Sequence, residues 1–182
     1  MSQHPFQGVT FDDVISYDTR THNVVMQHGS MPKREDLEGW EFRGFNPPGF
    51  AKLLGFQKFM KGFFVDGGTL AGYNLFVENA RAGASAPWRP KGGDTSKRHG
   101  YYDALPVKPG STYDEYDHAL LLDYGSGRNS PANPESRIRD YLVQVDPQNP
   151  DLFLGKAYLD LGLTSVFSNF FVLERLRPAP QH

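Results

Sequence analysis

Residues 137–176 read RIRDYLVQVDPQNPDLFLGKAYLDLGLTSVFSNFFVLERL. Three runs rich in β-branched and aromatic residues, at 137–145, 152–160 and 165–176, are separated by the turn formers of 146–150 and by Gly162. Strands joined by such short turns must be antiparallel, because a parallel return needs a crossover of a dozen or more residues. The stretch therefore predicts three consecutive antiparallel strands.

The same alternation of short aromatic runs and turn formers extends back to residue 39. It predicts five earlier strands, at 39–46, 56–65, 70–79, 99–106 and 117–125. No helix-sized pattern lies between them, which excludes a parallel βαβ sheet. Antiparallel strands in this number expose two edges unless the sheet closes. We therefore expect a mainly all-β protein, an up-and-down β-barrel of about eight strands with room for one small ligand; a β-sandwich is the structural alternative.

The N-terminal residues precede the strands and have a different character. Thr10 is suited to be the N-cap of a short helix, with Asp12 and Asp13 in its first turn and fraying beyond Tyr17. Pro32 marks the start of a second helix of one or two turns.

These patterns suggest three parts of the chain. Residues 1–36 are expected to form a helical segment that packs on the barrel, 37–177 the β-barrel domain, and 178–182 a flexible tail. The two longer connections within the barrel, 80–98 and 125–134, are expected at its mouth as loops or lids.

The composition excludes several classes of protein. Lys and Arg number 19 and Asp and Glu 21, so the formal net charge is −2, and we expect no nucleic-acid partner. Cysteine is absent, which excludes disulfides, thiolate nucleophiles and Cys-ligated metals and fits a reducing compartment. The first eight residues lack the basic start and apolar core of a secretory signal, so we expect a cytoplasmic location. The most apolar stretch, 50–65, is interrupted by Lys52, Lys58 and Lys61, so we expect no membrane span.

Aromatic residues concentrate along the second and third predicted strands. Such a run can line a pocket for a flat or long apolar ligand, or it can form an ordinary packed core. The residues concerned are Phe56, Phe59, Phe63, Phe64, Tyr73 and Phe76. On the last two strands, Tyr158 and Phe171 are further candidates for contact with an apolar ligand.

Charged residues interrupt the middle of several apolar strands. Buried charges must be paired or hydrogen-bonded. Candidates for an internal polar cluster that orients a ligand head group are Asp123, Arg139, Asp140 and Lys156. The alternative is that about half of them face water. For contact with the polar end of a ligand we assign Arg139, Lys156 or Tyr141.

Motifs for metals, cofactors and serine nucleophiles are missing from the sequence. The six histidines contain no pair at the i, i+2 or i, i+4 spacing of a typical metal site, so we expect no metal. There is no G-x-S-x-G elbow and no G-x-G-x-x-G or Walker loop, so we expect no cofactor. His99 and His118 each have the chemistry of a general base, with a role at the rim or in a loop as the alternative.

Several runs together resemble the lipocalin-like, GxWxG-type uncharacterised bacterial proteins, which have a calycin-style barrel. The runs are Leu37-Glu38-Gly39-Trp40-Glu41-Phe42-Arg43-Gly44, Phe59-Met60-Lys61-Gly62-Phe63-Phe64, Tyr102-Asp103-Ala104-Leu105-Pro106, Leu154-Gly155-Lys156-Ala157-Tyr158 and Phe170-Phe171-Val172-Leu173-Glu174-Arg175. The resemblance covers about residues 37–177 and implies that Trp40 packs on Arg175 and closes one end of the barrel. One departure is that Gly39 directly precedes Trp40, followed by Gly44, in place of the Gly-x-Trp-x-Gly pattern.

Three hypotheses for function follow. The first is binding of a small hydrophobic molecule inside a lipocalin-like barrel. The second is a cofactor-independent isomerase, cyclase or hydratase, in which Asp123 or Asp140 works with Tyr141 or His118 inside a dry pocket. The third is an interaction protein, including a homodimer, in which strands that are apolar on both faces bury a partner.

Overall fold

The computed structural model describes residues 4–47, 49, 55–93 and 96–180. Lys52 of the apolar stretch, residues 94–95 of the connection 80–98, and residues 181–182 of the expected tail lie outside the described residues. Within the described part, no helix has the length and apolar character that crossing a bilayer requires.

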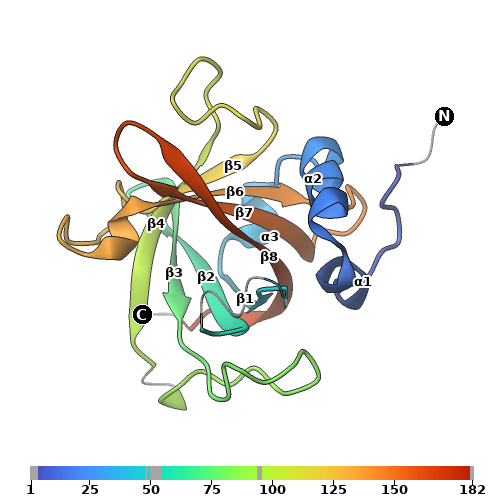
Figure 1. Ribbon diagram of the computed structural model, residues 1–182. Helices are drawn as coiled ribbons and strands as arrows, with labels where there is room; N and C mark the ends of the chain where they lie inside the picture. The colour runs from blue at the N-terminus through green and yellow to red at the C-terminus, as the bar shows by residue number, and fades with distance from the viewer. Residues whose placement is uncertain (1–3, 48, 50–54, 94–95, 181–182) are drawn as a thin grey trace.

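The strands form one closed antiparallel up-and-down barrel (Figure 1). In chain order they are β1 (Trp40–Phe45), β2 (Lys58–Asp66), β3 (Thr69–Leu75), β4 (Arg98–Pro106), β5 (Leu120–Asp123), β6 (Ile138–Gln144), β7 (Leu152–Asp160) and β8 (Ser165–Pro178). Each strand pairs with the next, and β8 pairs with β1 to close the sheet. The predicted fold class is therefore confirmed, and the β-sandwich alternative is wrong.

Several strand ends differ from the sequence prediction, among them those of β3, β5 and β8. β3 ends at Leu75 instead of residue 79, and β5 is limited to Leu120–Asp123. β8 continues to Pro178, and the N–H of Ala179 donates to the carbonyl of Gly39 at 2.8 Å. The first two residues of the expected tail are thus tied to the beginning of β1.

Residues 10–28 contain two helices where the sequence predicted one. α1 (Phe11–Ser16) begins with the predicted cap: the N–H of Asp13 donates to the Thr10 hydroxyl, and the Asp13 carboxylate accepts from the Thr10 N–H. The expectation that the chain frays beyond Tyr17 is wrong. The Asp18 carboxylate accepts the Thr21 N–H at 2.7 Å and caps a second helix, α2 (Thr19–His28).

One more helical turn links these helices to the barrel, and a second lies between strands. α3 (Arg34–Leu37) is the short helix predicted after Pro32. A 3-10 turn, η2 (Pro134–Arg137), immediately precedes β6.

The strands β6, β7 and β8 are buried on both faces by the protein itself. On β6, Leu142 packs in the interior with Phe153 and Phe171. Its neighbour Val143 packs on the outside, in the cluster that includes Val25 of α2. Helices α1 and α2 thus cover the outer surface of these strands, which explains their two-sided apolar pattern without a partner chain.

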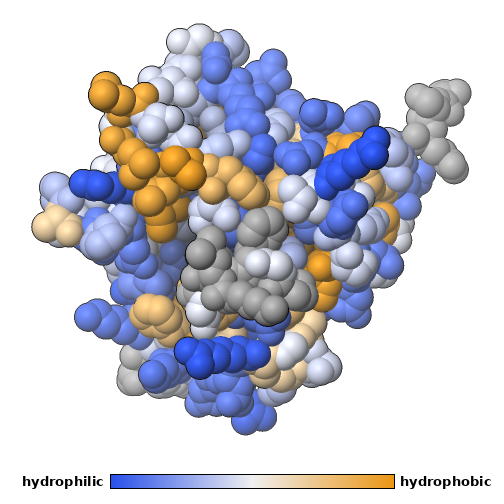
Figure 2. Space-filling model, viewed as in Figure 1, coloured by the Kyte–Doolittle hydropathy of each residue, from blue (hydrophilic) through white to orange (hydrophobic). Residues whose placement is uncertain are grey.

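Apolar side chains remain exposed at the hairpin between β7 and β8. Leu161 and Val166 are half exposed, and Leu163 is fully exposed. Figure 2 shows the corresponding hydrophobic patch at the upper left of the molecule. This patch is separate from the surface that the helices cover.

One end of the barrel is plugged beside Trp40. The guanidinium of Arg175 lies 4.6 Å from the centre of the Trp40 ring, the contact implied by the family resemblance. Arg175 also donates to the carbonyl of Asp36 at 2.8 Å, which links α3 to β8. Trp40 packs against an interior cluster that includes Phe42 and Phe153, so the open space of the barrel lies toward its other end.

Candidate functional site

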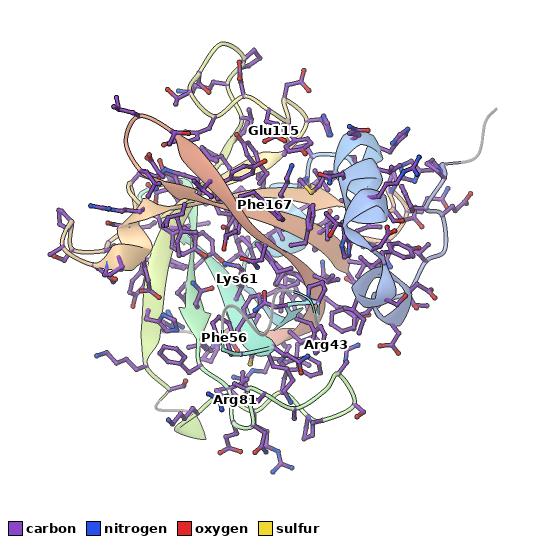
Figure 3. All side chains as sticks on the ribbon, in the orientation of Figure 1. Arg43, Phe56, Lys61, Arg81, Glu115 and Phe167 are labelled. Carbon is purple, nitrogen blue, oxygen red and sulfur yellow. The ribbon has the colours of Figure 1, made fainter. Side chains whose placement is uncertain are left out.

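A cavity of about 440 Å³ occupies the interior of the barrel away from Trp40. This volume lies within the range of small-molecule sites. Its lining comprises Asn46, Phe56, Lys58, Phe59, Lys61, Asn74, Leu75, Phe76, Ala80, His99, Tyr124, Glu135, Ile138, Asp140, Ala157, Tyr158, Leu159, Ser168, Asn169 and Phe171. In the view along the barrel, Lys61 lies near the centre of the ring of strands, whereas Arg43 and Glu115 lie at its periphery (Figure 3).

One side of the cavity is aromatic. The Phe59 ring lies over Gly44, its cross-strand partner on β1, and the Phe171 ring lies over Gly155, its partner on β7. The two rings meet edge to face with centroids 5.8 Å apart. Phe76, at 60% exposure, stands at the opening.

A polar group organised by a buried lysine lies next to these rings, because Lys61 Nζ is 5.1 Å from the centre of the Phe171 ring and 5.8 Å from that of Phe59. Lys61 Nζ donates to Asn74 Oδ1 at 3.0 Å and to the Tyr124 hydroxyl, and it lies 3.5 Å from Asp140 Oδ2. The Tyr124 hydroxyl donates to the same Asp140 oxygen at 3.2 Å. We refer to Lys61, Asn74, Tyr124 and Asp140 as the interior polar cluster.

The register of the barrel brings these four side chains together. Lys61 of β2 is the cross-strand partner of Asn74 of β3, and Asp140 of β6 pairs with Leu122 of β5, two residues before Tyr124. Lys61, Asn74 and Asp140 take inward positions of their strands, and Tyr124 directly follows β5.

Burial changes the acid–base properties of the cluster. Removal from water raises the pKa of Asp140 and lowers the pKa of Lys61, and the attraction between the two charges opposes both shifts. Burial also raises the pKa of Tyr124 well above its ordinary value. The donor and acceptor pattern fits an ammonium, a neutral phenol and a carboxylate.

A second polar pair lies nearer the cavity opening. His99 Nδ1 is 2.7 Å from Glu135 Oε1, and the His99 ring stacks on Phe76 with centroids 3.9 Å apart. The hydrogen bond from His99 holds the pKa of Glu135 below its usual range. Glu135 comes from η2, which is capped by the side chain of Asn133.

Four of the eight residues predicted to bind ligand line the cavity: Phe59, Phe76, Tyr158 and Phe171. The Tyr158 side chain itself packs with the outer cluster and donates its hydroxyl proton to Glu115. Phe63 points inward but packs deeper, edge to face with Phe42 and Tyr102, and does not reach the cavity.

Tyr73 is on the outer face of β3 and donates to Glu41 Oε1 at 2.8 Å. Its assignment to a pocket wall is therefore wrong, as is that of Phe64, which lies beneath Arg128. Both residues neighbour inward-facing positions on their strands, so the alternation of strands places them outside.

Arg139 and Lys156 are also on the outer face of the barrel. Arg139 pairs with Asp123 at 3.1 Å and with Asp160 at 3.7 Å. Lys156 Nζ donates to Glu115 Oε1 at 2.8 Å. The predicted internal cluster is therefore wrong, since Arg139 and Asp140 are consecutive and must face opposite sides.

Of the four catalytic candidates, only Asp140 lines the cavity. Asp123 is outside with Arg139, and Tyr141 packs in the outer cluster, where burial raises its pKa to about 12. His118 Nε2 is 2.8 Å from the carbonyl of Met26, on α2. Asp123, Tyr141 and His118 therefore cannot act with Asp140 on one molecule held in the barrel.

The sequence interpretation missed Lys61, Asn74, Tyr124 and Glu135 as site residues. A signal for Lys61 was present, because it shares one strand face with Phe59 and Phe63. A charge in the middle of an aromatic inward face indicates a buried polar site.

Parts of both long connections pack against the outside of the barrel. In the first, Trp88 Nε1 donates to the carbonyl of Gly44 at 3.1 Å, and its ring packs on Phe11 of α1. In the second, Asn129 binds the backbone of Tyr101 on β4. From the first connection, Ala80 lines the cavity.

Among the described residues, no three His, Asp or Glu side chains are grouped so that they could hold a metal ion. Comparison of the chain with protein-family models, with curated proteins and with solved structures finds no match. The closed barrel is compatible with a lipocalin-like fold, and no family match supports the GxWxG group. Function is therefore inferred from the cavity itself.

Proposed function

We propose that this lipocalin-like barrel binds a small, mainly hydrophobic molecule in its interior. The observation that carries the proposal is the cavity of about 440 Å³, whose lining combines the rings of Phe59 and Phe171 with the buried pair of Lys61 and Asp140. Apolar walls supply burial, and a few convergent polar groups fix orientation; this combination is typical of small-molecule sites. A cytoplasmic location belongs to the same proposal, because the chain contains no cysteine.

The first test is native mass spectrometry of freshly purified protein, followed by denaturing extraction of bound material. We expect a copurifying molecule whose mass is lost on denaturation. The variant Ala157→Phe places a ring in the cavity, because Ala157 lines it from β7. Ala132→Leu, at an exposed loop position outside the cavity, is the matched control. Retention of the same molecule by Ala157→Phe would contradict binding inside the barrel.

The paired His99 and Glu135 favour a second candidate, a cofactor-independent isomerase, cyclase or hydratase. A carboxylate that accepts from one ring nitrogen orients the imidazole and leaves the other nitrogen to accept a proton. Incubation of the copurified molecule with protein in D₂O tests this candidate. A catalyst of proton transfer adds deuterium to the molecule, and His99→Gln abolishes the gain in mass; a carrier protein leaves the mass unchanged.

Self-association is a separate question from the cavity. We propose that any homodimer uses the exposed hairpin between β7 and β8, where Leu161 and Leu163 are exposed. Sedimentation at increasing concentration, with Leu163→Glu as the comparison, tests this. A constant monomer mass would remove the homodimer from consideration.

A further inference from the structure

Each donor atom of the interior polar cluster already has a partner within the cluster or on the backbone. The ammonium of Lys61 carries three protons, and its partners are Asn74 Oδ1, the Tyr124 hydroxyl and the Asp140 carboxylate. Tyr124 gives its only proton to Asp140. The amide of Asn74 donates to the carbonyl of Gly100 and to the Tyr124 oxygen.

In contrast, the cluster has an unused acceptor. Asp140 Oδ2 is engaged by Tyr124 and Lys61, but Asp140 Oδ1 has no hydrogen-bond partner among the residues that the structure describes. The residue is only 2% exposed and lines the cavity. A buried carboxylate oxygen without a partner costs free energy, and a ligand donor recovers that cost. Oδ1 is itself covered, so a ligand donor reaches it only when the side chains around it move.

The remaining charged groups on the cavity do not provide a free cation. Lys58 Nζ is engaged by the carbonyls of Ala86 and Pro87 and lies over the Trp88 ring. Glu135 adds a further negative charge, which is paired with His99. A ligand carboxylate placed beside Asp140 would meet a like charge and no unused donor.

We propose that the cavity selects an apolar ring or chain compound that carries a hydrogen-bond donor, a hydroxyl or an N–H group, and that it discriminates against carboxylates. The donor binds the Asp140 carboxylate, and the apolar body lies against Phe59 and Phe171. This inference rests on the proposed function, since it names the chemical class of the ligand for the same cavity.

Three probes with the same ring system test the selectivity: 2-naphthol, 2-methoxynaphthalene and 2-naphthoate. They share the apolar body and differ in offering a neutral donor, no donor and a negative charge. Titrations at pH 7 followed by naphthalene fluorescence give the three dissociation constants. We expect 2-naphthol to bind at least tenfold more tightly than either other probe, a difference of about 1.4 kcal/mol.

Two variants locate the selectivity. In Asp140→Asn, the preference for 2-naphthol over 2-methoxynaphthalene falls below threefold, and 2-naphthoate binds more tightly than to the wild type because Lys61 has lost its counter-charge. Asp123→Asn is the matched control, since Asp123 lies outside with Arg139, and it keeps the wild-type order. If Asp140→Asn does not fold, the order of the three probes on the wild type decides alone.

The possible results distinguish a failure of donor selection from a failure of ligand binding in the cavity. Similar affinities for all three probes, or tighter binding of 2-naphthoate, would overturn donor selection while leaving a ligand-binding cavity. Failure of all three probes to bind at millimolar concentration would count against the proposed function and the selectivity together. Tenfold selectivity that survives Asp140→Asn would place the recognising atom elsewhere and overturn the role of Asp140.

Discussion

The ring of Phe171 on β8 lies directly over Gly155, its cross-strand partner on β7. A Cβ atom built on Gly155 would lie 2.0 Å from Phe171 Cζ, far inside van der Waals contact. Gly44 with Phe59 and Gly72 with Tyr102 repeat this arrangement on other inward-facing pairs. Because glycine has no side chain, it makes room for a ring that lies flat on the sheet. The rings of Phe171 and Phe59 held in this way line the cavity.

We expect Gly155→Ala to displace the Phe171 ring into the cavity. The predicted result is at least tenfold weaker binding of 2-naphthol, together with about 1–3 kcal/mol lower free energy of unfolding from overpacking. Chemical denaturation and the naphthol titration measure the two effects. Gly83→Ala is the control, because nothing lies within 4 Å of a Cβ at that position and its φ is not positive. Equal behaviour of the two variants would show that the Phe171 ring moves aside without cost.

The buried pair of Lys61 and Asp140 gives a prediction about stability. Lys61→Met leaves the Asp140 carboxylate buried without its cation, so we expect the free energy of unfolding at pH 7 to fall by about 3–5 kcal/mol. Because burial already raises the pKa of Asp140, the loss should shrink as the pH falls and the carboxyl takes up a proton.

The double variant Lys61→Met with Asp140→Leu checks this reading. It removes both charges and fills their space with apolar groups, so most of the lost stability should return. Urea denaturation of the wild type, both single variants and the double variant forms the cycle. Additive losses would show that the two side chains do not interact.

The strands were predictable because a period of two and short turns are local signals. Which face of each strand points into the barrel was not predictable. On β6 both Tyr141 and Leu142 belong to apolar faces, and only the packing of α2 against Val143 shows which face is outside. The alternation places Asp140 and Arg139 on opposite sides, but for this reason it could not show which of the two faces the interior.

Helix α2 could not be predicted from the sequence for a different reason. Its residues TRTHNVVMQH include β-branched and polar residues of modest helix propensity, and no apolar stripe stands out. The helix forms because Asp18 caps it and because Val25 and Met26 are fully buried against the barrel. Whether such a segment becomes helical depends on tertiary packing, which cannot be recognised from a short stretch of sequence.

His22 of α2 should make the stability of the protein depend on pH. It is 1% exposed, its Nε2 is 2.8 Å from the Val14 carbonyl, and its ring lies 5.0 Å from that of Phe170. Burial lowers the pKa of His22 below 6.5, and the charge of Asp18 only partly opposes this. The contribution is therefore fully present above pH 6.5 and is lost as the pH falls through the lower pKa of the folded state.

We accordingly expect thermal stability to fall between pH 6.5 and pH 5, and to fall less steeply in His22→Gln, which keeps a neutral donor for Val14. Differential scanning calorimetry across this range measures the two slopes. His28→Gln, at an exposed position of the same helix, should retain the wild-type slope. Identical slopes in wild type and His22→Gln would assign the pH dependence to another group.

Arg175 should stabilise the plugged end of the barrel without affecting the cavity. Its guanidinium lies over Trp40 and donates to the carbonyls of Asp36 and Pro150, so it ties β8 both to the segment 36–40 and to the turn before β7. We expect Arg175→Ala to lower the free energy of unfolding by about 2 kcal/mol. Arg175→Lys should recover less than half, because an ammonium cannot stack and bind two carbonyls in the same plane.

The comparison for Arg175 is Arg128→Ala, which removes an exposed ion pair with Asp66 and should cost less than about 1 kcal/mol. Urea denaturation gives the stabilities, and the 2-naphthol titration should be unchanged in every Arg175 variant that folds, since the cavity lies toward the other end. A cost for Arg175→Ala no larger than that for Arg128→Ala would mean that the interior cluster around Phe42 and Phe153 closes this end by itself. Weakened naphthol binding would instead mean that the two ends of the barrel are coupled, because an ordered plug would then be needed to hold the strands that carry Lys61 and Asp140.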